Sequence, residues 1–445
     1  YSYADRYLFQ ANVRHDGSSR FAKGYRWGTF PSFSAGWVMS EEKFMKNLNW
    51  DWLSFLKLRG SWGMLGNERI GDNYFPYIAL MSFGNSLFYM ADGSVVSDKT
   101  ARPAVLAVED ITWETTTSTD IGLDANFFNN RLQFHFDYYW KQTKDMLLNI
   151  EIPYFMGYNN PSTNAGKMST HGYDIELAWN DRIGDFKYGV NVNFSDFLSK
   201  IDYMNDGEQI SGGKIKRAGV LFNEYYGYVC DGIYQTQEEV NNSARTSTTV
   251  TVGDLQYRDI SGPDGVPDGI ISPEYDRVPL GNSLPRFQYG GTFNASYKGI
   301  DFSIAFQGIG KQNSYLSTAM VQPLRDNFGN VPSILEGKYW SPFNTAEENL
   351  SAKYPRLSNV SKNNNYATSS FWMFNGSYFR LKNLTLGYTL PETWTQKAGI
   401  NRVRFYVSGS DLFCLSNFPD GWDPEMSYKA YPITTSLVMG LQVNF

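Results

Sequence analysis

The sequence lacks a hydrophobic run that could form a transmembrane helix. No stretch of the 445 residues approaches the roughly 18 uncharged apolar residues that such a helix needs. The mean hydropathy is −0.41, and hydrophobic residue types make up only 42% of the chain. These values exclude a helical membrane protein. They do not exclude a β-barrel, because alternation of apolar and polar residues keeps the average hydropathy of a barrel low.

Cysteine, histidine and clustered positive charge are also scarce. Cys230 and Cys414 have no Cys or His neighbour at metal-ligand spacing, so we expect no zinc site. The three histidines, His15, His135 and His171, accompany no nucleophile elbow, no cysteine–histidine pair and no phosphate-binding motif. The net charge is −6, and no stripe of Lys and Arg offers a surface to nucleic acid. The sequence therefore favours neither an enzyme nor a nucleic-acid-binding protein.

The strongest pattern that is present is the alternation of apolar and polar side chains. Successive side chains of a strand point to opposite faces, so this alternation suits a strand between lipid and a polar lumen. In 132–140 and 186–194 the pattern nears the length of about 9 to 11 residues that a tilted membrane-spanning strand needs. The segments that show the alternation are 6–14, 30–38, 55–64, 121–127, 132–140, 173–179, 186–194, 287–297, 302–306, 379–388, 403–409 and 437–445.

Aromatic residues strengthen the membrane interpretation. They make up 17% of the chain, and Tyr and Trp rings gather at both bilayer interfaces of barrels. Helical periodicity is limited to short segments such as 41–48, with Ser40 as its predicted N-cap. We therefore predict an all-β fold, a transmembrane antiparallel β-barrel. A soluble all-β glycan-binding domain is the alternative, but it would leave the strands of membrane-spanning length unexplained.

No linker divides the chain into domains. A length of 445 residues would suit two or three soluble domains, yet no Pro/Ser/Gly-rich segment or composition shift separates them. Nothing in the first thirty residues resembles a secretory signal, and the strand pattern begins at once. We expect residues 1–445 to be the carboxyl-terminal part of a larger barrel. The alternative is a complete twelve-stranded barrel.

Several long segments occur in the order typical of one transporter family. They are YADRYLFQANVRHDGSSRFAKGYRWGTFPSFSAGWVMSEEKFMK, LKLRGSWGMLGNERIGDNYFPY, WETTTSTDIGLDANFFNNRLQFHFDYYWKQTKDML, GYVCDGIYQTQEEV, SYFRLKNLTLGYTLP and the closing GLQVNF. Together they resemble the SusC/RagA family, the TonB-dependent nutrient transporters of Bacteroidetes outer membranes. The resemblance implies a plugged barrel of about 22 strands. This chain would supply roughly its second half, with the plug and the amino-terminal segments outside it.

The resemblance also implies a function and partners. SusC-type transporters import a nutrient, an oligosaccharide or a peptide, beneath a SusD-like surface lipoprotein that acts as a lid. TonB–ExbB–ExbD supplies energy through the amino-terminal part, and outer-membrane lipid surrounds the barrel. Two alternatives stay open. One is a passive substrate-specific porin or an adhesin barrel, and the other is a TonB-dependent receptor for siderophores or cobalamin, which has no SusD-type partner.

Two long loops, 67–100 and 312–370, carry side chains that could hold such a substrate. Stacking rings and hydrogen-bonding groups serve oligosaccharides and peptides alike. Because the periplasmic turns of these barrels are short, the length of both loops indicates the extracellular side. The predicted contact residues are Tyr74, Tyr77, Tyr89, Tyr339, Trp340 and Trp372. For each of them, the alternative is a girdle or loop-packing role.

An acidic segment, 253–281, suggests a calcium site. Calcium prefers several oxygen ligands around a glycine-permitted turn, here at Gly265. The predicted ligands are Asp259, Ser261, Asp264, Asp268 and Asp276. The matching family segment usually has Asn in place of Ser261, and Pro263 adds a residue, so the register of an EF-hand-like loop is broken. A turn stabilised by its own aspartates explains the same residues, and no other cofactor is expected.

The chain ends on an aromatic residue. Carboxyl-terminal aromatic residues generally serve as the recognition signal for the machinery that assembles outer-membrane barrels, and Phe445 resembles that pattern. We therefore expect Phe445 to be an assembly signal. Simple packing at the bilayer interface is the alternative.

Overall fold

The structure is a computed structural model that describes residues 1–48, 50–70, 74–205, 207–316, 321–324, 329–419, 421–426 and 430–445. Strands dominate these ranges, and the helices in them are short; α2 (Gln237–Asn242), for example, has 6 residues. None of the helices within the described ranges has the length and apolar character needed to cross a membrane.

The strands belong to two compact units. The first unit comprises Tyr1–Trp179, Ser195–Gln209 and Arg217–Leu221. The second unit comprises Asn180–Phe194, Ile210–Lys216 and Phe222–Phe445. Two long strands, β9 (Ser162–Ile183) and β10 (Phe186–Met204), contribute residues to both units.

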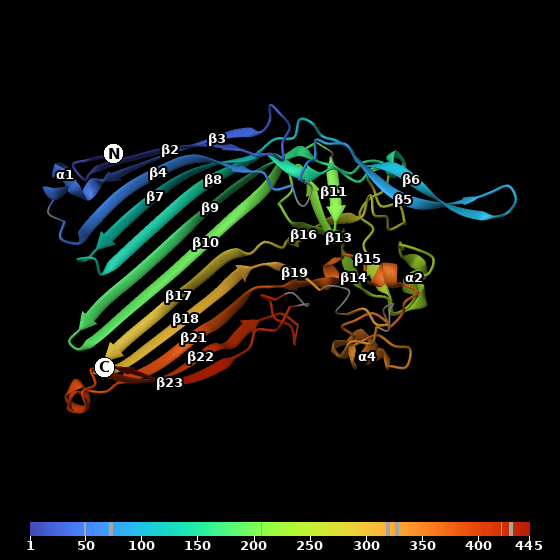
Figure 1. The fold of residues 1–445 in the computed structure, drawn as a ribbon. Helices are drawn as coiled ribbons and strands as arrows, with labels where there is room; N and C mark the ends of the chain where they lie inside the picture. Colours follow the sequence, from blue (N-terminus) through green and yellow to red (C-terminus); the bar gives the residue numbers. More distant parts are fainter. Residues whose placement is uncertain are drawn as a thin grey trace. The chain divides into compact units, whose positions relative to one another are not determined.

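In the first unit, antiparallel strands lie side by side (Figure 1). From the outermost strand they are β1 (Ser2–Tyr3), β2 (Tyr7–Gly17), β3 (Trp27–Val38), β4 (Leu53–Asn67), β7 (Glu114–Phe127), β8 (Leu132–Asn149), β9 and the second half of β10. Their register places Arg59 opposite Gly122, and Gly122 opposite Asp137. Polar side chains of three neighbouring strands therefore share one face, as the alternation predicts.

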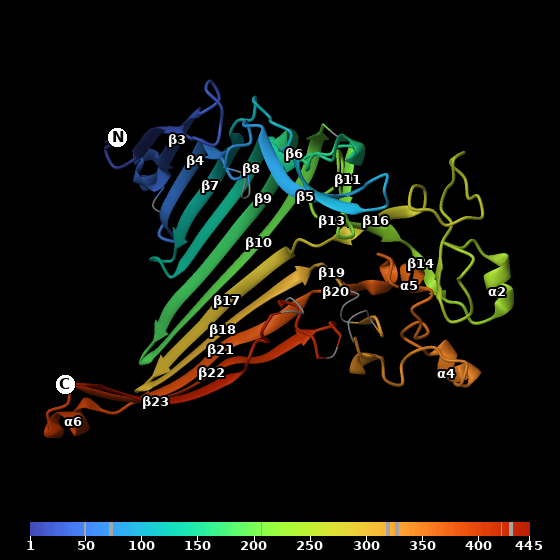
Figure 2. The same ribbon diagram turned by 45° about the vertical axis from the view of Figure 1, so that its right-hand side comes forward.

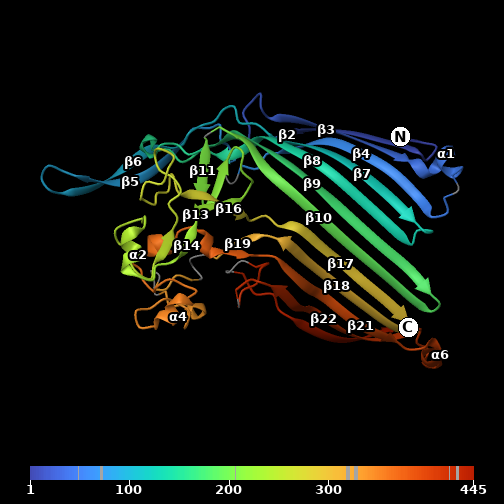
Figure 3. The same cartoon turned by 180° about the vertical axis from the view of Figure 1, so that it is seen from behind.

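The second unit repeats this arrangement, which is also visible from behind (Figure 3). Its strands are the first half of β10, then β17 (Arg286–Tyr297), β18 (Ile300–Lys311), β21 (Tyr378–Thr389), β22 (Arg402–Ser416) and, outermost, β23 (Ser436–Asn444). In β23, the side chains of Leu437, Met439 and Leu441 are 66%, 74% and 58% exposed. Exposed apolar side chains at period two are unfavourable in water but are solvated by lipid.

Successive antiparallel strands are connected alternately at one end of the strands and at the other. The connections at one end are short, and those at the other end are long. Short turns occupy 128–131 in the first unit and 298–299 in the second. The long connection 68–113 of the first unit holds β5 (Leu80–Tyr89) and β6 (Val95–Val105). These two strands pair as a separate hairpin that extends away from the other strands of its unit (Figure 2).

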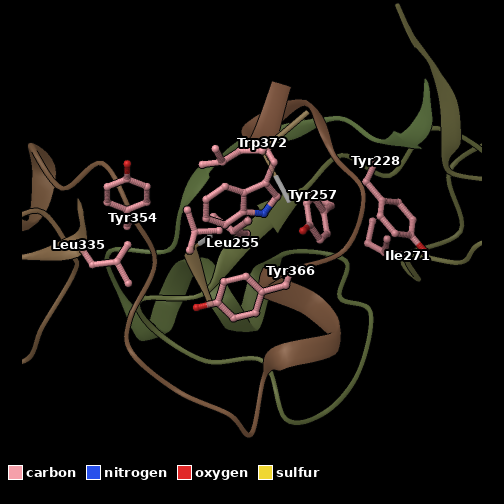
Figure 4. Packing of buried hydrophobic residues seen from close by; sticks show 10 residues of the cluster. Tyr228, Leu255, Tyr257, Ile271, Leu335, Tyr354, Tyr366 and Trp372 are labelled. Atoms are coloured by element: carbon pink, nitrogen blue, oxygen red, sulfur yellow. The ribbon is translucent and has the colours of Figure 1, made fainter. Parts of the chain in front are cut away.

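The long connections of the second unit build a hydrophobic core of their own, which we call the loop core (Figure 4). Its buried members are Tyr228, Leu255, Tyr257, Ile271, Leu316, Val321, Leu335, Tyr354, Tyr366 and Trp372. Trp372 is only 1% exposed, and its ring stacks with Tyr354 at 6.1 Å and with Tyr366 at 5.7 Å. Its indole N–H donates to the Asn365 carbonyl at 2.8 Å. The loops of this unit are thus packed rather than loose.

Short elements scaffold the connections. The strands are β11 (Glu208–Ser211), β12 (Lys214–Arg217), β13 (Glu224–Tyr228), β14 (Cys230–Ile233), β15 (Leu255–Tyr257), β16 (Arg277–Asn282), β19 (Asn313–Tyr315) and β20 (Met373–Asn375). The helices are η2 (Tyr154–Met156), η3 (Ser333–Leu335), α4 (Ala346–Leu350), α5 (Lys362–Asn365), η4 (Ser370–Trp372), α6 (Glu392–Thr395) and η5 (Gln396–Ala398). Capping boxes of Thr236 with Glu239 and of Thr345 with Glu348 begin α2 and α4.

All the segments predicted as strands are strands of these two units, although the structure extends several, such as the 22-residue β9. The predicted helix over 41–48 is confirmed only in part. Residues 39–46 form η1 (Met39–Glu41) and α1 (Lys43–Lys46), and Ser40 lies inside η1 instead of capping a helix. Glu42 between them is extended, because its carboxylate accepts hydrogen bonds from Arg6 at 2.9 Å and from Tyr7 at 2.5 Å. These contacts with β2 and the residue before it outweigh local helix propensity.

We predict that Trp372→Ala destabilises the loop core selectively. Replacing a buried Trp with Ala costs about 3–5 kcal/mol, because it leaves a cavity. In the full-length protein, limited proteolysis should cleave the 312–377 connection much faster, while the mobility of the folded barrel on unheated gels stays the same. Trp394→Ala is the matched control, since this ring is 64% exposed on α6. Equal protease resistance of the two variants would show that the loop core is not what orders the connection.

Candidate functional site

The inner face of the first unit carries a charged network centred on Arg59. Its guanidinium donates to Asp137 at 2.6 Å and to Asp124 at 3.2 Å, and it lies 3.5 Å from Asp120. His135 Nδ1 lies 3.0 Å from the same Asp124 carboxylate. The register places His135 opposite Asp124 on the same polar face.

A glycine makes this network possible. A Cβ at Gly122 would lie 2.5 Å from the Arg59 guanidinium carbon and 2.7 Å from an Asp137 oxygen. Because Gly122 has no side chain, Arg59 can reach across β7 to β8. The wall that results is polar and fixed in geometry, so it suits the lining of a water-filled or protein-filled lumen rather than a lipid contact.

The second unit has a comparable network around Arg380, which is 3% exposed. Its guanidinium donates to Asp423 at 2.5 Å and lies 2.6 Å from Glu425. Glu425 also accepts hydrogen bonds from the Tyr378 hydroxyl at 2.6 Å and from the Gln307 amide. The network fixes the described part of the 417–435 connection against β18 and β21. Sequence reasoning missed it, because no local pattern links residues 423–425 to strands far away in the chain.

Three of the predicted substrate contacts lie in or beside the loop core. Trp372 is at its centre, and Tyr339 packs against it. Trp340 is 9% exposed, lies over Gly253 and donates from its indole N–H to the Gln235 side chain at 3.2 Å. The buried faces of Trp340 and Trp372 are used for packing, so these two rings offer no open surface for ligand stacking. The loop-packing alternative accounts for them.

The other three predicted contacts belong to the first unit and are more accessible. Tyr74 is exposed, and the guanidinium carbon of Arg20 lies 4.7 Å from the centre of its ring. Tyr77 meets Phe75 edge to face at 6.4 Å. Tyr89 ends β5 and is 84% exposed. Residues 71–73, 317–320 and 325–328 of the two predicted binding loops lie outside the described residues.

The acidic segment forms turns held by its own carboxylates. Both oxygens of the buried Asp276 accept backbone hydrogen bonds, from Ile260 at 2.7 Å, Ser261 at 3.2 Å and Ser272 at 2.7 Å. Asp259 accepts from the Gly269 N–H at 2.7 Å.

The remaining predicted ligands are less engaged. Asp268 accepts from the Ile270 N–H at 2.9 Å, and Asp264 is exposed. In the described part of the chain, no three His, Cys, Asp or Glu side chains converge as metal ligands. One Asp259 oxygen is buried and receives no hydrogen bond from the described residues, and it is the ligand most open to an ion.

A buried carboxylate of the acidic segment, which the sequence did not predict as a calcium ligand, organises the loop core. Asp254 is fully buried and accepts hydrogen bonds from Arg356 Nε at 2.7 Å and from Asn365 Nδ2 at 2.9 Å. Ser361 Oγ donates to the same carboxylate at 2.7 Å. Removing one partner of such a buried pair is strongly destabilising, so Asp254 has a structural role.

The cysteines show no nucleophilic environment. Both Cys230 and Cys414 are free. Burial raises the pKa of the Cys230 thiol to about 12, so this thiol stays protonated at neutral pH. Burial likewise holds the pKa of Tyr257 well above its ordinary value, and the Tyr257 hydroxyl donates to the Asn364 carbonyl at 2.5 Å. The Tyr257 side chain is thus a buried member of the loop core, and the Cys230 side chain packs against it.

Comparison with known proteins identifies the family. The family described as TonB dependent receptor-like, beta-barrel matches residues 1–408. TonB-dependent receptor P3 of Formosa agariphila is 30% identical over 482 residues, covering 100% of this chain and 44% of that protein. TonB-dependent receptor SusC of Bacteroides thetaiotaomicron is 30% identical over 460 residues, covering 100% of this chain and 43% of that protein.

The fold agrees with these sequence matches. The structure of the RagAB peptide transporter superimposes with a TM-score of 0.78 at 23% sequence identity, covering 99% of this chain and 46% of that one. The chain thus spans less than half the length of the relatives it matches. The predicted barrel fold and the predicted resemblance to SusC are confirmed. The chain belongs to the TonB-dependent receptor-like β-barrel family of the bacterial outer membrane.

Proposed function

We propose that the chain forms part of the barrel of an importer that carries a nutrient, an oligosaccharide or a peptide, across the outer membrane with energy from TonB. The single observation that carries this proposal is the family match over residues 1–408, together with the similarity to SusC. The polar network around Arg59 supports it, because an import path needs a hydrated wall. The family is one of receptors and transporters, and we propose no catalytic role.

We further propose two protein partners. TonB–ExbB–ExbD would act through a plug outside this chain, because a lumen of about 22 strands is too wide to stay open safely. A SusD-like surface lipoprotein would cover the end that carries the long connections. The β5–β6 hairpin supports a partner there, since Phe83 and Leu87 are 80% and 69% exposed and an isolated two-stranded hairpin is marginal in water.

The accessible aromatic residues are the proposed substrate contacts of the first unit. Tyr74, Tyr77 and Tyr89 keep ring surface that a sugar ring or a peptide side chain could cover. Tyr339 in the second unit is half-buried and is a weaker choice. The further alternatives, a passive porin and a siderophore or cobalamin receptor, differ from this proposal in energy source, partner and substrate.

We predict that uptake depends on the proton gradient. Cells that carry the full-length gene should accumulate labelled oligosaccharides or peptides, and a protonophore should reduce the initial rate at least tenfold, because TonB draws on that gradient. A strain without the gene gives the background rate. Uptake that persists at full rate with the protonophore would mean a passive porin. Energised uptake confined to iron chelates or cobalamin would mean a receptor of the other type.

We predict that Phe445→Ala lowers the amount of folded barrel in the outer membrane several-fold. The ring is 87% exposed at the end of β23, so its loss removes little packing, whereas loss of a recognition signal would impair assembly. Leu437→Ala is a matched control, because it shortens another exposed apolar side chain of the same strand. Unchanged yield of the folded, heat-modifiable form of Phe445→Ala would contradict a role as assembly signal.

Calcium binding by the acidic segment stays a prediction. If the segment binds calcium, elemental analysis of the purified full-length protein should find one calcium ion per chain. The double variant Asp264→Ala with Asp268→Ala should lose that ion. These two carboxylates are less engaged with the backbone than Asp276, so their removal should leave the turns folded. Wild-type protein without calcium would leave the turn interpretation as the explanation of this segment.

A further inference from the structure

A pocket of about 700 Å³ opens beside the loop core of the second unit. The described residues of its walls come from three separate stretches, within 332–338, at 353–354 and at 417–419 with 421–422, together with Phe374 of β20. None of the substrate contacts predicted from the sequence lines it. The volume lies in the range of known small-ligand sites, about 300–1,000 Å³.

The pocket has an apolar floor that rests on packed structure. Phe374 and Phe418 meet edge to face with ring centres 6.3 Å apart. Ile334, Phe374 and Trp422 all pack against the loop core. Tyr354, whose ring stacks on Trp372, also lines the pocket. Because these side chains already pack against the loop core, the floor is preorganised for a ligand.

Three sets of contacts hold the walls in place. The β19–β20 pairing sets Ser314 opposite Phe374. The backbone carbonyl of Lys338 accepts hydrogen bonds from the N–H of Lys353 at 2.8 Å and from that of Tyr354 at 3.0 Å. The buried Arg380 pairs with Asp423, next to Trp422, and so anchors the third wall. The pocket is thus not a gap between independent loops.

The charged side chains among the described lining residues have one sign. Lys338 and Lys353 both line the pocket and are exposed, and their backbones are directly bonded. Neither ammonium group has an ion-pair or hydrogen-bond partner among the residues that the structure describes. No Asp or Glu is among the described lining residues. Other cations of this unit, such as Arg356, Arg380 and Arg404, are paired with carboxylates. Two neighbouring positive charges therefore stand free beside an apolar floor.

We propose that this pocket binds the carboxylate end of a peptide, with Lys338 and Lys353 facing the carboxylate and an apolar side chain on Phe374, Phe418 and Trp422. The inference rests on the proposed import function and deepens it by choosing between its two substrate classes. An oligosaccharide carries a hydroxyl on nearly every carbon and needs many hydrogen-bonding partners. Among the described lining residues, the neutral polar groups are the side chains of Ser333 and Asn417, the Tyr354 hydroxyl and the Trp422 indole N–H. These are few for an oligosaccharide, so the pocket suits a charged group beside an apolar one.

The test is direct binding to the full-length protein in detergent, measured by titration calorimetry. The probes are a phenylalanine-terminated tripeptide with a free carboxylate, the same peptide as its amide, and an oligogalacturonate as a carbohydrate that also carries carboxylates. We expect the free acid to bind about tenfold more tightly than the amide, because each exposed ion pair contributes up to about a fivefold change. The double variant Lys338→Gln with Lys353→Gln should abolish this difference between acid and amide.

The double variant Lys298→Gln with Lys397→Gln is the matched control. It also removes two positive charges, but from the connections 298–299 and 390–401, which join β17 to β18 and β21 to β22 and do not line the pocket. It should keep the full preference for the acid. The proposal is overturned if the tripeptide does not bind, if acid and amide bind equally to the wild type, or if the lysine pair can be removed without effect. Binding of the oligogalacturonate in place of the tripeptide would overturn the choice of peptide. Because the assay needs no TonB, it is independent of the uptake experiment: a passive porin with this pocket would still bind the acid.

Discussion

The constraint on which the rest of the structure depends is the backbone hydrogen bond in lipid. A peptide group without a partner costs several kcal/mol in a hydrocarbon environment, roughly what one hydrogen bond is worth there, so a strand can cross a bilayer only when it is paired on both sides. In both units the long strands pair with their sequence neighbours in antiparallel order, with β1 and β23 outermost. Pairing in chain order requires short turns at one end, such as 128–131 and 298–299. It leaves the other end free to carry long connections.

The two faces of each strand then meet two different environments. In the second unit, lipid accepts the exposed apolar row of β23, whereas the alternate residues carry polar contacts such as the hydrogen bond from Arg404 to Asp301. In the first unit, the polar face carries the network around Arg59. Charges on the inner face are held at fixed distances by their partners on neighbouring strands, and Gly122 provides the space that Arg59 needs. The inner wall of the first unit is therefore a rigid polar surface, and in the proposed importer we expect the long connections to supply most of the substrate specificity.

The long connections of the second unit bury a hydrophobic core of their own, as a water-soluble domain does. They bury aromatic rings around Trp372 and use Asp254 to satisfy the polar groups that come with them. Arg380 holds the described part of the 417–435 connection against β21 through Asp423 and Glu425. This packing turns loops into a scaffold on which a binding pocket can have defined walls. The lysine-lined pocket follows from that scaffold, because its apolar floor is the outer surface of the loop core.

The strands could be predicted from the sequence because their signal is local. Alternation at period two is visible in any stretch of ten residues. The loop core could not be predicted in this way. Its residues run from Tyr228 to Trp372, and they come into contact only because connections that are distant in the sequence pack against one another. Trp340 and Trp372 therefore looked like exposed loop aromatics, whereas Lys338 and Lys353 carried no signal until the structure brought them together. The match to SusC could be anticipated, because long ordered segments preserve the family pattern.

The central claim is that this chain serves an energised importer with a lid. The most direct test is the intact mass of the native polypeptide extracted from outer membranes in mild detergent, with identification of whatever co-purifies. The account predicts a polypeptide roughly twice the length of this 445-residue chain, since the chain covers 43–46% of its relatives, together with a bound surface lipoprotein. A native mass near 50.7 kDa without a partner would contradict it and would indicate a passive barrel.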